Sequence, residues 1–333
     1  MQFPYICKLN LQMKTIVGTD IQEAISLLKA GETVAVPTET VYGLAANGLN
    51  EIAISKIFEA KGRPLSNPLI LHFANEATVL PFVSDFPEAL KKLAAKFWPG
   101  PLTFLLPKTD LVPEAITAGQ VKVAVRVPNH PILRELLSQV DFPLAAPSAN
   151  SYGMISPTQA THVYKQLQGK IPYILDGGSS ANGLESTIVG IEDEKVIVYR
   201  LGSISIEHLA SVLGYEPSIN NHSDDKPLTS GMVKHHYAPS TPFSFIGESI
   251  TFNPTDNFGY IFLKDSNSEI PSTHKYILSK TGNLEEAAKN LYAAMHEMDQ
   301  RGFTKLFVER FSNDGLGLSM NDRLNRATMK FEK

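Results

Sequence analysis

The chain has 333 residues, of which 43% are hydrophobic and 19% are charged, and its formal net charge is -4. This length suits two domains, or one domain with a large appendage, and the apolar fraction is sufficient for real hydrophobic cores. The slight negative charge excludes a protein whose whole surface attracts nucleic acid or anionic membranes, so any RNA contact has to be local and weak.

The first residues hold the only cysteine, Cys7, and a short apolar run that Pro4 and Lys8 interrupt. One cysteine cannot build a disulfide framework, a cysteine zinc site or an iron–sulfur cluster, which favours a reducing, cytoplasmic setting. The interrupted run makes a poor signal peptide, and no stretch approaches the ~20 apolar residues needed to cross a bilayer. The regular pattern begins after Met13, so either Met1 or Met13 is expected to be the native start.

From residue 14 to about residue 214, short β-rich runs alternate with amphipathic helices. Asp20 and Glu23 mark the start of the first helix and Gly31 marks its end. The other predicted helices are Pro87–Trp98, Pro131–Val140 and Pro157–Leu167, and the predicted strands are Thr33–Val36, Leu69–Phe73, Leu102–Leu106, Val121–Val127, Pro143–Ala146, Thr187–Ile191 and Val196–Tyr199. Strands this numerous, mixed with helices, predict an α/β domain on a large twisted sheet, and the pattern leaves the strand order open.

The amino-acid composition changes at Tyr215. The segment from there to residue 242 is polar, rich in turn residues and without periodicity, as in a linker. Beyond it, Leu284–Gln300 carries apolar residues at helical spacing. Strands are predicted around that helix at Phe243–Ile246, Tyr260–Leu263, Tyr276–Leu278 and Leu306–Glu309. The sequence therefore predicts a large domain over residues 13–214, a linker over 215–242 and a small α/β domain over 243–333.

Several familiar signatures are absent from the sequence. There is no GxxxxGK[ST] phosphate loop, no dinucleotide fingerprint, no GxSxG elbow and no HExxH motif. His235, His236 and His296 lack the spacing of metal ligands, so a surface or core role is favoured for them over a metal site. No protein-bound metal is predicted.

The candidate binding residues lie instead in clusters of polar residues at the ends of predicted strands. The segment Pro37–Leu44 directly follows a predicted strand, where open α/β sheets bind ligands, although threonines bonded to the local backbone explain it equally well. Lys61 and Arg63 follow the end of a helix, on a stiff stretch that Gly62 and Pro64 interrupt. Two cations held there favour phosphate binding over a simple interaction with the helix dipole.

Further polar residues lie along the following strands. Arg126 falls inside an apolar strand, where it needs either an Asp or Glu partner or the carboxylate of a ligand. Ser148 and Asn150 follow another strand, whereas Ser156 before Pro157 favours an ordinary helix cap. The remaining clusters are Glu185-Ser186-Thr187, Arg200 and His236-Tyr237-Ala238-Pro239.

Taken in order, these clusters form the series PTETVYGLA, KGRP with NPLILHF, VRVP, APSAN, ESTIV, YRLG, HYAP and GLGLSMNDRLNRA. The series resembles the YrdC family of threonylcarbamoyl-AMP synthases, and its last two motifs resemble the longer, two-domain members. The resemblance covers nearly the whole chain from Met13 onward. It implies a twisted open sheet with a concave, positive cavity, a small Rossmann-like C-terminal domain, and a linker that crosses the mouth of the cavity.

The reaction that this resemblance implies joins L-threonine, bicarbonate and ATP into L-threonylcarbamoyladenylate and pyrophosphate, with Mg²⁺ accompanying ATP. The product is then used by a separate threonylcarbamoyl transferase that modifies tRNA. Such a reaction requires mainly positioning and charge neutralisation from the protein, so no covalent nucleophile is expected. Lys61 and Arg63 are the expected catalytic cations; no general base is evident, and His72 is the nearest candidate for one.

The resemblance also assigns the two binding sets. Threonine is expected to contact Thr40, His72, Arg126, Ser148 and Ser186, with Arg126 on its carboxylate. ATP is expected to contact Arg63, Asn67, Lys122, Asn150, Thr158, Arg200 and Tyr237, with Lys122 acting through its backbone.

Two other functions are compatible with a YrdC-like domain. An RNA-binding module without adenylate-forming activity would show salt-sensitive affinity for RNA, and the net acidity of the chain argues against this as its main role. A carbamoyltransferase of hydrogenase maturation would carry an acylphosphatase region and zinc-finger cysteines. A chain with Cys7 as its only cysteine does not fit that class.

Overall fold

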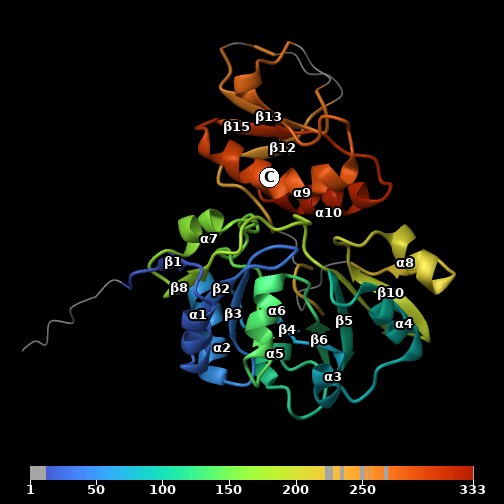
Figure 1. Ribbon diagram of the computed structural model, residues 1–333. Helices are drawn as coiled ribbons and strands as arrows, with labels where there is room; N and C mark the ends of the chain where they lie inside the picture. The colour runs from blue at the N-terminus through green and yellow to red at the C-terminus, as the bar shows by residue number, and fades with distance from the viewer. Residues whose placement is uncertain are drawn as a thin grey trace, which may run out of the picture.

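The computed structural model describes residues 13–221, 228–232, 236–247, 252–253, 255–265 and 269–332. The predictions that concern Cys7, His235 and the middle of the linker therefore lie outside the described residues. The described chain forms two α/β units, the larger one below and the smaller one above in Figure 1. This confirms the predicted fold class, a twisted open sheet domain joined to a smaller α/β domain.

The large unit is built on an eleven-stranded sheet of parallel and antiparallel pairs, in the order β1-β8-β2-β3-β7-β4-β6-β5-β9-β10-β11. Its strands are β1 Ile16–Gly18, β2 Val34–Val36, β3 Gly43–Asn47, β4 Ile70–His72, β5 Leu102–Pro107, β6 Lys122–Arg126, β7 Leu144–Ala145, β8 Tyr173–Leu175, β9 Thr187–Glu192, β10 Lys195–Arg200 and β11 Ser218–Ile219. Every strand predicted for this unit overlaps an observed strand. The short strand β11 lies within the predicted linker, so the first part of that segment is not free of regular structure.

The helices of the large unit cover the sheet. They are α1 Ile21–Lys29, α2 Glu51–Lys61, α3 Glu76–Val79, the 3₁₀ turn η1 Leu80–Phe82, α4 Glu88–Phe97, α5 Glu114–Thr117, α6 Pro131–Ser138, α7 Ala160–Leu167 and α8 Ile206–Leu213. The predicted signals that bound α1 are confirmed: the Asp20 side chain accepts hydrogen bonds from two backbone N–H groups, and Gly31 follows the helix with φ of +76°.

Two local predictions are wrong. No strand was predicted between β2 and β4, yet β3 begins at the end of the segment Pro37–Leu44 that was interpreted as a strand-end loop, because its buried residues show no polar alternation. The helix α7 starts at Ala160 rather than at Pro157, and Ser156 is not its cap. Instead, the Ser156 hydroxyl donates a 2.6 Å hydrogen bond to Oε1 of Glu185.

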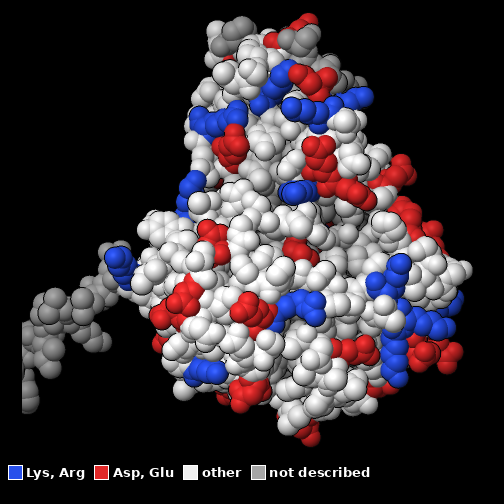
Figure 2. All heavy atoms as spheres, in the orientation of Figure 1, with Lys and Arg blue, Asp and Glu red and all other residues white. Residues whose placement is uncertain are grey.

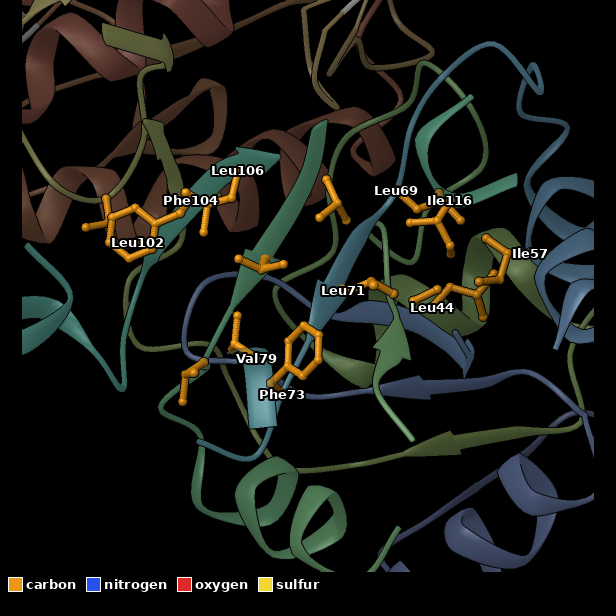
Figure 3. Close-up of a cluster of buried hydrophobic side chains, with 14 of the residues drawn as sticks. Leu44, Ile57, Leu69, Leu71, Phe73, Val79, Leu102, Phe104, Leu106 and Ile116 are labelled. Atoms are coloured by element: carbon orange, nitrogen blue, oxygen red, sulfur yellow. The ribbon is translucent and has the colours of Figure 1, made fainter. Parts of the chain in front are cut away.

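The main core lies between this sheet and its helices, as Figure 3 shows for residues of neighbouring strands that point toward one another. Phe104 on β5 is completely buried, and its ring centroid lies 4.8 Å from that of Trp98 and 5.4 Å from that of Phe86. Burial of such a ring removes a large apolar area from water, so this cluster holds β5 in the middle of the sheet.

The small unit has a four-stranded, fully parallel sheet in the order β12-β15-β13-β14. Its elements are β12 Phe243–Phe245, β13 Phe258–Phe262, the 3₁₀ turn η2 Ser272–His274, β14 Lys275–Ile277, α9 Leu284–Gln300, β15 Lys305–Val308 and α10 Leu316–Thr328. The helix α9 has the predicted bounds, whereas α10 was not predicted. No helix of the described chain is long and apolar enough to cross a membrane.

The helices α9 and α10 lie on the side of the small sheet that faces the large unit (Figure 1). One hydrophobic cluster contains residues of both units, including Val41, Ile155 and Leu184 of the large one. A Cβ on Gly183, which has φ of +75°, would lie 2.4 Å from the backbone oxygen of Lys289 on α9. Glycine is therefore required where the loop before β9 meets α9, and the two units pack directly against each other at the strand-end loops.

Candidate active site

A small polar cavity of about 30 Å³ lies at the ends of the central strands of the large sheet. Strand register explains its position, because His72 on β4 pairs with Arg126 on β6, which in turn pairs with Thr103 on β5. Its lining includes all five side chains predicted to contact threonine, together with Arg200 and three linker residues: Thr40, His72, Arg126, Ser148, Ser186, Arg200, Ser230, His236 and Tyr237. The structure therefore brings together residues that lie far apart in the sequence.

Arg126 has the buried acidic partner that was one of the two alternatives left open by the sequence. Its Nη2 donates to Oε1 of Glu39 at 2.7 Å, so it has a buried ion pair, and its Nη1 donates to Thr40 Oγ1 at 3.1 Å. Its Nε donates to the Gly100 carbonyl at 3.2 Å. The same side chain also lines the cavity. Sequence reasoning missed Glu39 as the partner, although Glu39 stands next to Thr40 in the first polar cluster.

The two threonines of the segment Pro37–Leu44, Thr38 and Thr40, have different hydrogen-bond partners. The Thr38 hydroxyl accepts from the backbone N–H groups of Thr40 and Val41 at 3.1 Å and donates to the Val41 carbonyl at 2.6 Å. Thr38 thus forms the local turn that was one of the two alternatives. The Thr40 hydroxyl accepts from Arg126 and lies 2.7 Å from that of Thr38, and both threonines line the cavity.

Ser186 and Arg200 form the opposite wall. Arg200 Nη2 donates to Ser186 Oγ at 2.8 Å and its Nε donates to the Ser186 carbonyl at 3.0 Å, while Ser186 Oγ also lies 2.7 Å from Thr103 Oγ1. Arg200 Nη1 donates to the carbonyl of Ser230 in the linker at 3.1 Å. Burial lowers the pKa of Arg200 to about 10, which leaves it a cation at neutral pH.

Lys61 and Arg63 lie behind the cavity wall rather than in its lining. The αL glycine Gly62, with φ of +63°, ends α2 between them. Lys61 Nζ donates to the backbone carbonyls of Ser148 and Asn150, and Arg63 donates to the carbonyls of Asn67 and Pro68. Burial, followed by the charge of Arg63, holds the pKa of Lys61 well below its usual range. Neither side chain has a carboxylate partner among the described residues, and two adjacent buried cations without one are costly, so the pair fits a site for a polyanion.

His72 is buried and electrically neutral at physiological pH. Burial, followed by the nearby charge of Arg126, lowers its pKa to about 3. Its Nδ1 has no hydrogen-bond partner among the described residues. A neutral imidazole in the cavity wall can accept a hydrogen bond or a proton from a ligand.

The other residues predicted for ATP surround the cavity at a greater distance. Asn67 Nδ2 donates to the Tyr152 hydroxyl at 3.1 Å, and the Thr158 hydroxyl lies 3.4 Å from Nδ1 of His162. Asn150 donates to the carbonyls of Ser151 and Met154. Lys122 lies apart from the cavity lining, since its Nζ reaches the Ile191 carbonyl at 3.4 Å.

The described part of the linker forms one wall of the cavity. Tyr237 is buried with φ of +65°, a left-handed conformation that costs a residue with a side chain roughly 1–2 kcal/mol. Its ring centroid lies 4.0 Å from that of His236 and 5.8 Å from that of Tyr292 on α9, and the Arg323 guanidinium lies 4.9 Å from it. These contacts hold a strained residue over the cavity.

The described side chains around the cavity offer few possible ligands for a magnesium ion. Within the described ranges, no group of three or more His, Cys, Asp or Glu side chains is placed to hold a metal ion. The nearest carboxylates, Glu39 and Glu185, are ion-paired with Arg126 and Arg323. A magnesium ion here would have to take its ligands mainly from ATP phosphates and water, as this ion commonly does.

Comparison with known proteins places these features in one family. Residues 26–202 match a family model described as "Telomere recombination", and residues 204–328 match one described as "Threonylcarbamoyl-AMP synthase, C-terminal domain". Proteins named threonylcarbamoyl-AMP synthase from Pyrococcus abyssi and Bacillus subtilis are each 37% identical to this chain and cover 92% of it, over 94% and 92% of their own lengths.

A solved structure agrees with these matches. The crystal structure of P. abyssi Sua5 complexed with L-threonine superposes with a TM-score of 0.84 at 34% identity, and it covers 95% of this chain and 97% of its own. The chain therefore belongs to the threonylcarbamoyl-AMP synthase family.

Proposed function

We propose that this protein is a threonylcarbamoyl-AMP synthase, a nucleotidyltransferase that makes L-threonylcarbamoyladenylate and pyrophosphate from L-threonine, bicarbonate and ATP. The observation that carries this proposal is the convergence of Thr40, His72, Arg126, Ser148 and Ser186 on one cavity. The relatives that cover nearly the whole chain bear the name of this activity. The large unit, 13–214, would hold the site, with the linker at 215–242 and the small unit at 243–333.

Threonine would bind with its carboxylate on Arg126. This guanidinium is buried, lines the cavity and uses only three of its five N–H groups in the contacts described above. The hydroxyls of Thr40, Ser148 and Ser186 would then surround the amino and hydroxyl groups of the ligand. A charged hydrogen bond in such a dry setting is stronger than one in water, which favours tight orientation of a small amino acid.

ATP would bind on the side of Lys61, Arg63 and Arg200. These buried cations currently donate to backbone carbonyls, which are weaker acceptors than phosphate oxygens. Triphosphate would therefore draw the cations toward it, with Mg²⁺ bound to the phosphates. Polar contacts to the rest of the nucleotide would come from Asn67, Lys122, Asn150, Thr158 and Tyr237.

The chemistry would need no covalent enzyme intermediate. The threonine amine attacks the bicarbonate carbon to form a carbamate, and the departing hydroxide takes the amine proton and leaves as water. A carbamate oxygen then attacks the α-phosphorus of ATP, and pyrophosphate leaves with the electron pair of the broken P–O bond. Neutral His72 would accept a hydrogen bond from the threonine amine during the first step, and Lys61 and Arg63 would neutralise the leaving pyrophosphate.

Access to the site would require the linker to move. A cavity of about 30 Å³ has room for only one or two water molecules, which is too small for threonine. Ser230, His236 and Tyr237 form the wall that is not part of the large sheet domain. Protease cleavage of the linker should therefore change when ATP and threonine are added, and identical cleavage with and without ligands would count against this movement.

The product would pass to a separate threonylcarbamoyl transferase acting on tRNA, which sets the reaction in the cytoplasm. A main role in RNA binding is not favoured, because acidic and basic side chains are interspersed over the face in Figure 2. Any direct RNA contact would be local and weak.

The proposal is tested by pyrophosphate release from ATP in the presence of threonine and bicarbonate. We expect release to require both co-substrates and to fall strongly when serine replaces threonine. Release that is independent of the amino acid, or equal with serine, would show that the assignment of threonine is wrong. Salt-sensitive RNA binding without any pyrophosphate release would favour the alternative function.

A further inference from the structure

Arg323 on α10 belongs to the small unit, yet its guanidinium reaches the wall of the cavity. Among the described residues it is the largest side chain that is fully buried, with a relative exposure of 1%. Its Nε donates to Oε2 of Glu185 at 2.9 Å, its Nη1 donates to Oδ2 of Asp322 at 2.6 Å, and its Nη2 donates to the Leu201 carbonyl. A buried arginine with this many partners has one fixed position.

Two of these partners flank the residues of the cavity wall. Glu185 directly precedes Ser186, and Leu201 directly follows Arg200. One guanidinium therefore joins the segment that enters β9 to the segment that leaves β10. The two segments touch closely, because a Cβ on Gly202 would lie 2.5 Å from the Glu185 carbonyl oxygen.

Glu185 is the centre of this network, and both of its oxygens are occupied. Oε1 accepts from the Ser156 hydroxyl at 2.6 Å, and the hydroxyl of Tyr292 on α9 lies 3.0 Å from Oε2. Burial acts to raise the pKa of Glu185, but the charges of Arg323 and then Arg200, with the Ser156 hydrogen bond, outweigh it and lower the pKa to about 2. Glu185 therefore remains an anion, and it lines the cavity together with Arg200.

The loss of Arg323 would leave this anion without its main partner. A buried carboxylate in that position pairs with the nearest remaining cation, because an unpaired buried charge is expensive. That cation is Arg200, whose charge already acts on Glu185. Arg200 would then be drawn from Ser186, and the wall would lose its arrangement.

We propose that Arg323 is a positioning residue of the synthase: through Glu185 and the Leu201 carbonyl, the small domain holds Ser186 and Arg200 in place for threonine and ATP. This inference rests on the function proposed above and gives the small domain a part in the active site. Tyr292 and Ser319 act in the same way, since the Ser319 hydroxyl donates to the Gly202 carbonyl at 2.9 Å.

The test compares Arg323→Gln, Glu185→Gln and the double variant in steady-state kinetics of pyrophosphate release. We expect Arg323→Gln to lower kcat/KM for threonine by about tenfold or more, chiefly through KM, and Glu185→Gln to have a smaller effect. The double variant should recover to within about threefold of the wild type, because a neutral amide in place of the Glu185 carboxylate cannot capture Arg200. The exposed pair of Arg301 with Glu297 on α9 provides the control Arg301→Gln, which should leave the kinetics unchanged.

Several results would overturn the proposal. A double variant as impaired as Arg323→Gln, or worse, would show that the ion pair has only a structural role. Unchanged kinetics of a folded Arg323→Gln would show that the wall does not depend on it. If Arg323→Gln does not fold, Tyr292→Phe provides the test, because it removes the hydroxyl that bonds Glu185 and keeps the ring. A higher KM for threonine in Tyr292→Phe would support the proposal, and an unchanged KM would overturn it. A wild-type chain without threonine-dependent release would refute the proposed function itself, which keeps the two failures distinct.

Discussion

Arg126 and Arg323 are both buried and both paired with a glutamate, yet they stand in different relations to the cavity. Arg126 lines the cavity, where we propose that it binds the threonine carboxylate, while Arg323 lies behind the wall and donates to Glu185 and to the Leu201 carbonyl. By this proposal, a buried arginine–carboxylate pair serves substrate binding at one position and support of the cavity wall at the other. Substitutions at the two positions should therefore produce different kinetic signatures.

Replacing Arg126 with alanine should raise the KM for threonine by about 10- to 100-fold, since hydrogen bonds to charged groups contribute about 1.5–3 kcal/mol. The KM for ATP should change little, because the predicted phosphate contacts lie on Lys61, Arg63 and Arg200. Steady-state kinetics with each substrate varied in turn measures this difference. The exposed Arg134 on α6 offers the control Arg134→Ala. Equal effects of Arg126→Ala on both substrates would contradict the assigned role.

Sequence reasoning identified the residues that line the cavity better than the residues that support them. Thr40, Arg126, Ser148 and Ser186 belong to compact motifs that resemble a family, so they were predicted and found together at the cavity. Glu39 was missed as the partner of Arg126, and Ser156 was misassigned as a helix cap. Both errors have one physical cause: a buried ion pair or hydrogen bond between distant segments has no local pattern.

At the scale of elements, the core around β5 should be sensitive to truncation. Phe104→Ala removes a completely buried ring that contacts Phe86 and Trp98, and such changes cost about 3–5 kcal/mol. Urea denaturation followed by fluorescence or circular dichroism measures the change in the free energy of unfolding. Leu111, which is 58% exposed, provides the control Leu111→Ala with an expected change below about 0.5 kcal/mol. A loss below about 1 kcal/mol for Phe104→Ala would contradict the packing described.

The linker element makes a second prediction. Tyr237→Ala should weaken retention of ATP, because Tyr237 lines the cavity and holds a strained position between His236 and Tyr292. Nucleotide affinity from calorimetry, or the release rate of a fluorescent ATP analogue, measures the effect. Tyr164, which is 40% exposed on α7, supplies the matched control Tyr164→Ala. An unchanged affinity of Tyr237→Ala for ATP would show that Tyr237 does not contribute to the ATP site.

Elements with strong periodicity were predictable, and elements without it were not. The helix α9 was predicted with its observed bounds, because seventeen residues of amphipathic pattern outweigh local irregularities. The strand β3 was not predicted, since Gly43–Asn47 has residues buried on both faces and no alternation. The helix α10 was missed because much of its buried face is polar, including Arg323 and Asn321, whose partners lie elsewhere in the fold.

At the scale of the whole molecule, buried histidines predict sensitivity to acid. Burial is the main cause that lowers the pKa of His72, His162 and His236 to about 3 and that of His296 to about 4. In the unfolded chain each imidazole takes up a proton below about pH 6.5, whereas in the native chain it stays neutral until the pH is far lower. Between these limits the unfolded state binds more protons, so stability must fall as the pH falls.

Urea denaturation at pH 7 and pH 5 should show this loss, with each histidine contributing roughly 1–2 kcal/mol. His162 and His296 stack across the two units at a centroid distance of 4.0 Å, so the double substitution by glutamine should flatten the pH dependence. A free energy of unfolding that stays constant or rises between pH 7 and pH 5 would be incompatible with neutral buried histidines.

The relation between the two units could not be predicted from the sequence. The sequence predicts two units, because the polar segment after Tyr215 separates two regions with periodic apolar residues. The contact between Arg323 and Glu185 joins residues 138 positions apart, and neither residue shows a local signal of its partner. Interfaces of this kind depend on how whole domains dock, which propensity and periodicity do not encode.

The central claim, that one cavity joins threonine, bicarbonate and ATP, is tested most directly by the chemical identity of the product. The wild-type chain is incubated with ATP, L-threonine and ¹³C-bicarbonate, and the nucleotide product is analysed by mass spectrometry. We predict a mixed anhydride between the carbamate of N-carboxythreonine and the phosphate of AMP, containing one ¹³C atom and formed together with pyrophosphate. A nucleotide product that lacks either threonine or the bicarbonate carbon would contradict the account.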